Sequence, residues 1–151
     1  MNKDLKIISG ILGILIVFTS ITGIYNIYYA PLDAQTYETK VSPINDQFQQ
    51  ILENDRRYMG TTQEPSEETV DSQLKSMIDQ MDALQKRGFP TQYNSFNEHF
   101  TNSMISYLQW RSHGRFTKSS YSDWLNGSKE MEIAYNSFNN VSITYTFEPE
   151  T

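Results

Sequence analysis

The chain of 151 residues contains no cysteine. This absence excludes disulfide bonds, thiolate metal sites, cysteine nucleophiles and lipid attachment through a lipobox cysteine. Histidine is almost as scarce, because His99 and His113 are the only two. Fourteen residues separate them on one predicted helix, which places them about 21 Å apart at 1.5 Å per residue. They therefore cannot bind one metal ion together through that helix alone.

The sequence also lacks the short motifs that mark common active sites. It has no glycine-rich phosphate loop, no Gly-x-Ser-x-Gly elbow and no His-Glu-x-x-His pair. We therefore predict no catalytic, metal-binding or cofactor-binding residue and expect a protein that is not an enzyme. Basic side chains are outnumbered, with 12 Lys and Arg against 18 Asp and Glu and a net charge of −6. This acidic balance argues against nucleic acid as a partner.

Formal charge is missing altogether from Ile7 to Leu32. The run Ile7–Ile24 holds nothing more polar than serine and threonine. A helix through this run would cover most of a hydrocarbon layer of about 30 Å. The aromatic residues that follow are typical of a membrane interface: Tyr25, Tyr28 and Tyr29. The pattern predicts a transmembrane anchor helix over residues 7–29.

A cleaved secretory signal is the alternative for this stretch. Its apolar region would span only about 7–15 residues and end at a small-x-small site. Here the run is longer, and Ala30 has Tyr28 two places before it and Pro31 after it. We therefore favour a retained signal anchor. Lys3 and Lys6 outnumber Lys40 beside the span, so residues 1–6 are predicted to be cytoplasmic and the domain after the span to be extracytoplasmic.

Small residues line one face of the predicted span. They step by four, then seven, then three positions: Ser9, Gly13, Ser20 and Gly23. Such a face lets a second membrane helix approach closely, which predicts integral membrane subunits as partners within the bilayer. The alternative explanation is that glycine and serine are common in membrane helices.

Two sequons follow in the region expected outside the cell, at Asn126 and Asn140. Each could carry a glycan if the host glycosylates secreted asparagines. Chance is the competing explanation in a chain this rich in asparagine and serine.

Residues 30–43 are expected to form a junction, because Pro31 and Pro43 both oppose a continuous helix. Within the junction, Thr36–Val41 is rich in β-branched and aromatic residues and predicts an extended segment. Residues 44–140 then carry helical periodicity and predict an up-down bundle of four helices. The predicted helices start at Pro43, near Ser66, near Thr91 and, after a short helix over 120–125, at Ser128. Asn126-Gly127 is a turn signal between the last two.

The tail, residues 141–151, changes period. Val141, Ile143, Tyr145 and Phe147 alternate with polar residues, which is strand patterning. We hypothesise that the tail pairs with Thr36–Val41 as a short two-stranded β ribbon at the base of the bundle. The alternative is that the tail adds to the sheet edge of a partner subunit.

The predicted topology collects basic residues at the end of the bundle far from the membrane. They are Arg56, Arg57, Arg111, His113, Arg115 and Lys118. One interpretation is a docking surface for an acidic partner. The other is that basic side chains gather at helix C-termini because they complement the helix dipole.

Aromatic residues make up 13% of the chain and are concentrated after residue 89. At helical spacing they predict a packed core, and a ligand pocket is the alternative. The fold class expected is therefore all-α, with a single transmembrane helix before an extracytoplasmic four-helix bundle. The function expected is that of a non-catalytic accessory or structural subunit of a membrane complex. An extracytoplasmic ligand-binding or sensory domain is the first alternative, and a pilin-like filament subunit is the second.

Overall fold

The computed structural model describes Tyr25 and residues 30–58, 60–114 and 117–139. The chain divides into two compact units, Met1–Pro31 and Leu32–Thr151, which are described separately. Apart from Tyr25, the predicted anchor helix, with Ser9, Gly13, Ser20 and Gly23, lies outside the described residues. Among the residues that are described, no helix combines the length and hydropathy that crossing a membrane requires.

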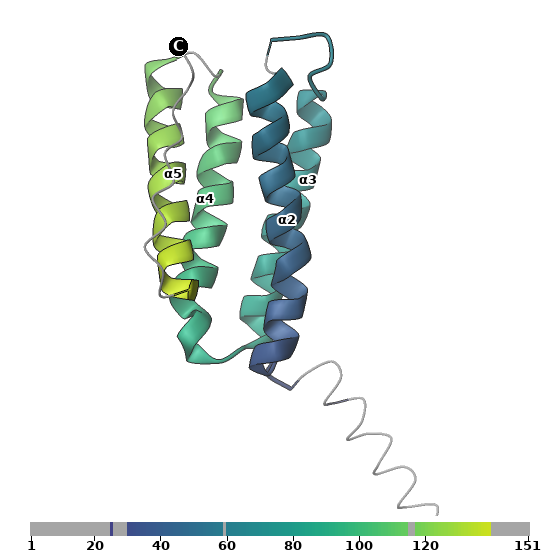
Figure 1. Cartoon of the computed structure of the whole chain (residues 1–151), viewed down its shortest axis with the longest axis vertical. Helices are drawn as coiled ribbons and strands as arrows, with labels where there is room; N and C mark the ends of the chain where they lie inside the picture. Colours follow the sequence, from purple (N-terminus) through teal and green to yellow (C-terminus); the bar gives the residue numbers. More distant parts are fainter. Residues whose placement is uncertain (1–24, 26–29, 59, 115–116, 140–151) are drawn as a thin grey trace, which may run out of the picture. The chain divides into compact units, whose positions relative to one another are not determined.

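The second unit is a bundle of α-helices. In its described part the helices are α2 (Ala34–Tyr58), α3 (Glu67–Arg87), α4 (Asn94–Ser112) and α5 (Lys118–Asn139), with a 3₁₀ turn, η1 (Thr91–Tyr93), before α4. Figure 1 shows the four α-helices side by side, each reversing the direction of the one before. The prediction of an all-α bundle is confirmed for this part of the chain.

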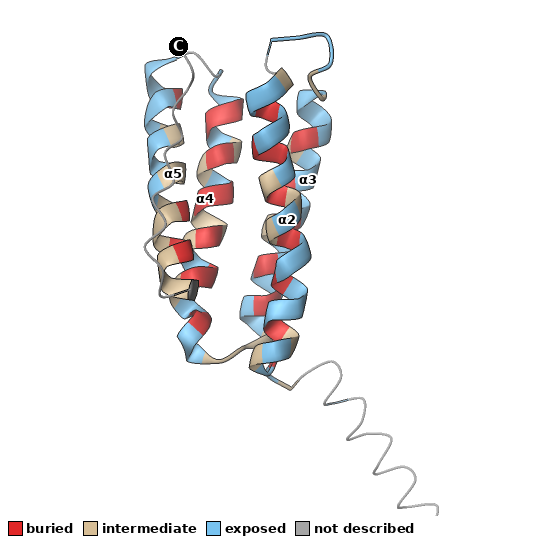
Figure 2. Cartoon of the chain, viewed as in Figure 1, coloured by how far each residue is buried: buried red, intermediate tan, exposed pale blue. Residues whose placement is uncertain are grey.

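The hydrophobic core runs along the inner faces of the helices (Figure 2). In α3 the apolar residues step by four, three, four and three positions, and every residue of this stripe is buried: Val70, Leu74, Met77, Met81 and Leu84. In α4, Phe100 and Met104 have no exposed surface. Burial of such side chains contributes about 1.5–3 kcal/mol each, which makes this core the main source of stability.

The start of α2 differs from the sequence prediction. We expected an extended segment over Thr36–Val41 and a helix that begins at Pro43, but α2 runs from Ala34 through Pro43 to Tyr58. An internal proline removes one helical hydrogen bond and costs about 3 kcal/mol. Two observations explain why the helix continues. Tyr37 and Val41 extend the buried stripe of α2, and Pro43 lies on the exposed face, where water can reach the carbonyl that it leaves unpaired.

The helical conformation of residues 36–41 contradicts the predicted β ribbon, which needed this segment as one of its two strands. Thr36–Val41 is helical and cannot pair as a strand. The tail, residues 141–151, lies outside the described residues, which themselves contain no strand. The boundary between the predicted junction and the bundle therefore moves from residue 43 to the start of α2. There the backbone amide of Thr36 donates to Asp33 Oδ1 at 2.7 Å, a capping interaction that lowers the pKa of Asp33.

Replacing Pro43 with alanine is expected to stabilise the bundle by about 1–2 kcal/mol. Alanine restores the missing amide hydrogen bond, while the more flexible unfolded chain offsets part of the gain. The measurement is the urea midpoint of the helical circular dichroism signal, with exposed Ser42→Ala as the control. An unchanged or lower midpoint would contradict a helix that continues through residue 43.

The ends of α3 and α4 agree with the sequence signals. Ser66 caps α3 by accepting from the amide of Thr69 at 3.3 Å. Gly88 and Gly114 follow α3 and α4 with φ of 85° and 74°. Glycine adopts such left-handed conformations without steric cost, which is why it ends these helices here.

Helix α5 also differs from the prediction of two helices with a turn at Asn126-Gly127. It is continuous from Lys118 to Asn139. Gly127 faces α4 instead: a Cβ atom there would lie 3.3 Å from Ser106 Cβ and 3.4 Å from the Ser103 carbonyl oxygen. The glycine therefore serves close packing of α4 against α5, and this tertiary contact outweighs the local turn preference.

Candidate functional site

The predicted basic residues gather at one end of the bundle. Arg56 and Arg57 lie in the last turn of α2, and Arg111 lies in the last turn of α4. His113 follows α4, and Lys118 begins α5. Figure 1 shows that these helix termini share one end of the bundle, which we call the loop end. Arg115 lies outside the described residues.

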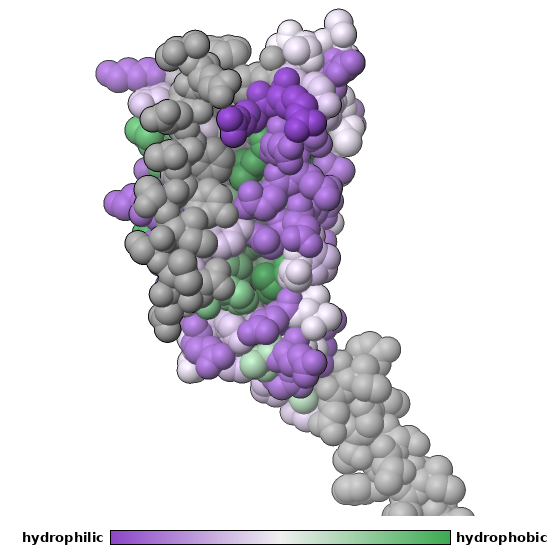
Figure 3. Space-filling model, viewed as in Figure 1, coloured by the Kyte–Doolittle hydropathy of each residue, from purple (hydrophilic) through white to green (hydrophobic). Residues whose placement is uncertain are grey.

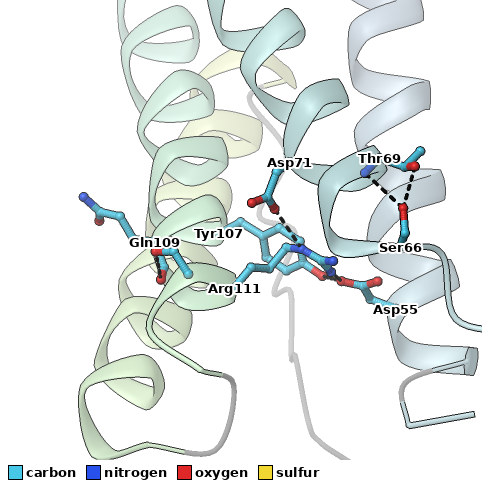
Figure 4. A network of polar contacts seen from close by, with 8 residues as sticks. Asp55, Ser66, Thr69, Asp71, Tyr107, Gln109 and Arg111 are labelled. Carbon is cyan, nitrogen blue, oxygen red and sulfur yellow. Dashed lines mark hydrogen bonds and ion pairs between the residues drawn. The ribbon is translucent and has the colours of Figure 1, made fainter.

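Arg111 is not exposed at the loop end. Its side chain is 1% exposed and forms an ion pair with Asp55 through Nη1 and Oδ2 (Figure 4). The same Asp55 oxygen accepts a hydrogen bond from the hydroxyl of Tyr107 at 2.6 Å. Arg111 Nε also lies 3.4 Å from Oδ1 of Asp71. We call these four residues the Asp55–Arg111 network; it joins α2, α3 and α4, and it takes Arg111 out of any docking surface.

The charge of Arg111 is held in place by its partners. Burial lowers the pKa of its guanidinium, but the negative charge of Asp55 and the hydrogen bond to it outweigh this effect, so that the pKa is raised. Two atoms of the network, Asp55 Oδ1 and Arg111 Nη2, have no hydrogen-bond partner in the described structure. An incompletely satisfied buried pair contributes little net stability, yet removing one partner is strongly destabilising.

The network was missed by the sequence analysis, although a signal for it exists. Asp55 follows Ile51 by four residues and Leu52 by three, so it occupies a core position on the apolar stripe of α2. Arg111 follows Tyr107 by four residues on the corresponding stripe of α4. Opposite charges on the core stripes of two helices that end at the same level indicate a buried pair.

The remaining basic residues of the loop end are exposed or partnered. Arg57 Nη2 lies 2.7 Å from Oε1 of Glu53, with both side chains more than 60% exposed. Such a surface pair contributes at most about 1 kcal/mol. Glu64 accepts from the amide of Gly60 at 2.7 Å in the loop after α2, and Glu67 and Glu68 begin α3. The loop end therefore carries charges of both signs.

Both histidines connect α4 to α5. His99 Nδ1 lies 2.6 Å from Oε2 of Glu130, and His113 Nδ1 lies 2.8 Å from Oδ2 of Asp123. Neither pair is joined by a third ligand, because the described residues contain no group of three or more histidine, aspartate or glutamate side chains arranged to hold a metal ion. The two pairs act as polar contacts between neighbouring helices.

Most of the described aromatic residues after residue 89 pack in or against the core, whereas Tyr121 is exposed. At the end of the bundle opposite the loop end, Tyr37 stacks on Tyr93 with ring centroids 4.7 Å apart, and Phe96 stacks on Phe100 at 5.1 Å. The Tyr37 hydroxyl donates to Oδ1 of Asn97 at 3.2 Å, and burial raises the pKa of this tyrosine. The prediction of a packed aromatic core, rather than an aromatic ligand pocket, is confirmed for these residues.

A small hollow lies between α2, α4 and α5. Its volume is about 10 Å³, close to the space that one water molecule occupies. Residues from all three helices line it, among them Phe48, Leu52, Trp124, Ser128 and Met131. Pockets that bind small molecules are typically about 300–1,000 Å³, so this hollow is too small for a cofactor.

Of the two predicted glycosylation sites, Asn126 lies exposed on α5 and Asn140 lies outside the described residues. Comparison with known proteins adds no assignment: no family model, curated protein or solved structure matches this chain. The function is therefore inferred from the chemistry of the chain itself.

Proposed function

We propose that this protein is a non-catalytic accessory or structural subunit of a membrane complex. Residues 7–29 anchor it as a single span, and the bundle lies outside the cytoplasm. The observation that carries the proposal is the uncharged run from Ile7 to Leu32, which precedes a bundle whose inward polar groups pair with one another. The side chains of Arg111, His99 and His113 each contact an acidic side chain of a neighbouring helix.

The size of the hollow favours this proposal over a sensory domain. A sensor needs a pocket that changes when its ligand binds, and the hollow between α2, α4 and α5, with a volume of about 10 Å³, is too small to be that pocket. A subunit needs instead a rigid body and a surface that holds its partner. In the proposal, the face made by Ser9, Gly13, Ser20 and Gly23 provides that surface within the bilayer.

The first experiment is extraction of the protein from its own membranes in mild detergent, followed by a native gel and mass spectrometry. Co-migration with integral membrane proteins at a fixed ratio is the expected result. Gly13→Leu should abolish this co-migration, because a large side chain keeps the second helix away. Thr22→Leu is the matched control, since Thr22 lies on the opposite side of the predicted helix from the small-residue face. Migration of the unmodified protein alone would refute the subunit proposal.

Orientation has a separate test that uses the absence of cysteine. Asp79→Cys on the exposed face of α3 provides a single thiol in the whole chain. A membrane-impermeant maleimide should label this thiol in intact cells as fully as in lysed cells. Labelling only after lysis would place the bundle on the cytoplasmic side.

A further inference from the structure

An incompletely covered groove lies between α2 and α5. The hollow described above is lined by Phe48 and Leu52 of α2 and by Ser128 of α5, and its α4 side is formed by Ser103 and Tyr107. Two large apolar side chains nearby on α5 are exposed, Tyr121 by 59% and Leu125 by 49%. Figure 3 shows hydrophobic surface in a furrow beside the hydrophilic outer surface of α2. We call this feature the α2–α5 groove.

We infer that the tail of the same chain, residues 141–150, covers the α2–α5 groove as an extended segment. In sequence the tail follows α5, which ends at Asn139, after the single residue Asn140. Its effective concentration at the groove is therefore far higher than that of any separate partner. Asn140 suits the chain reversal that this path requires, because asparagine tolerates the left-handed conformation that commonly follows a helix.

The extended length of the tail up to Tyr145 matches the length of α5 between Ser128 and Asn139. Ser128 lies eleven residues before Asn139, which is about 16 Å along a helix that rises 1.5 Å per residue. An extended chain rises about 3.3 Å per residue, so Tyr145 lies at about the same level, five residues after Asn140. Tyr145 and Phe147, on the apolar face of the alternating pattern, are then placed at the hollow. Their rings are too large to enter a space of about 10 Å³ and would instead cover its mouth.

The charges agree as well. Glu148 and Glu150 follow the alternating segment. At 3.3 Å per residue they reach about 26–33 Å from Asn140, which is the level of Lys118 at the start of α5. This is the loop end, where α2 contributes Arg56. Glu148 and Glu150 would therefore lie near Lys118 and Arg56, at an end of the bundle that carries charges of both signs, whereas a tail running away from the bundle would meet neither basic residue.

Cysteine cross-linking in the full chain tests this path directly, because the chain has no cysteine of its own. A pair made by Ser128→Cys and Tyr145→Cys should form an intramolecular disulfide under mild oxidation, since the two positions lie at one level. The matched pair is Asp79→Cys with Tyr145→Cys, which places the first thiol on the exposed face of α3 at mid-length. We expect at least tenfold more intramolecular disulfide in the first pair.

Other positions of the tail would give different cross-linked products. Disulfide-linked dimers would show that the tail covers the groove of a second copy, which overturns the inference. Equal cross-linking in both pairs, or none in the first, would overturn it too, because the tail would then have no fixed place at Ser128. Mass spectrometry after blocking free thiols distinguishes these products.

A second measurement does not depend on disulfide geometry. The single thiol of Ser128→Cys should react with maleimide about tenfold faster when Tyr145→Ser and Phe147→Ser remove the apolar face of the tail. The control is Thr144→Ser with Thr146→Ser, which alters the opposite face of the same segment and should leave the rate unchanged. Equal rates in the two backgrounds would overturn the inference.

Discussion

Asp55→Leu is expected to lower the free energy of unfolding by about 3–5 kcal/mol. The substitution leaves the guanidinium of Arg111 buried without its main counter-charge, and an uncompensated buried charge is among the most destabilising changes in a protein. It also removes the acceptor of the Tyr107 hydroxyl. The measurement is urea unfolding followed by helical circular dichroism. Glu53→Leu, two residues away on the exposed face, is the matched control and should change stability by less than about 1 kcal/mol.

Replacing the whole network is expected to restore most of this loss. A triple variant, Asp55→Leu with Arg111→Met and Tyr107→Phe, leaves neither charge nor an unpaired hydroxyl in the core. Its stability should lie within about 1–2 kcal/mol of the unmodified protein, in either direction. If the triple variant were as unstable as Asp55→Leu alone, the cost would come from packing and not from charge.

Gly127→Leu is expected to destabilise the bundle by about 2–4 kcal/mol. A Cβ atom added at this position would lie 3.3 Å from Ser106 Cβ, so the larger side chain of leucine must push α5 away from α4. Gly127→Ala should change stability by less than about 1 kcal/mol, because the helix propensity of alanine offsets the tight contact. Denaturation midpoints of the two variants measure the difference.

The control for Gly127 is its neighbour. Asn126 is exposed on the same helix, and Asn126→Leu should change stability by no more than about 0.5 kcal/mol. If leucine were tolerated equally at both positions, α4 and α5 would not be in close contact at Gly127. A turn at Asn126-Gly127, as local preference predicts, would then describe the chain better than a continuous α5.

The helices that the sequence predicted correctly are those in which local and tertiary signals agree. The second predicted helix has an N-cap at Ser66, a regular apolar stripe and Gly88 before Pro90, and it matches α3 closely. The errors fall where the two signals conflict. Pro43 and Asn126-Gly127 both favour interruption locally, but Tyr37 and Gly127 make contacts that hold the helix together. Local preferences amount to about 1–3 kcal/mol, which buried packing can outweigh.

The candidate site shows the same division. Its basic residues could be predicted to share the loop end, because helix order and direction follow from the apolar periods and short loops. Whether these residues are exposed could not be predicted, since the exposure of Arg111 depends on whether an opposite charge lies on the apolar stripe of a neighbouring helix. The histidine pairs with Glu130 and Asp123 likewise depend on the register between α4 and α5, which the pattern of either helix alone leaves open.

The sequence by itself determined the class of the protein: an uncharged segment, then helices with apolar stripes, and no cysteine for disulfides or thiolate chemistry. These properties are set by composition and local periodicity. Only the tertiary structure decided that α2 continues through Pro43, that α5 continues through Gly127 and that Arg111 is buried against Asp55. Each of these depends on atoms brought together from distant parts of the chain. Their interaction energies exceed the local preferences that oppose them.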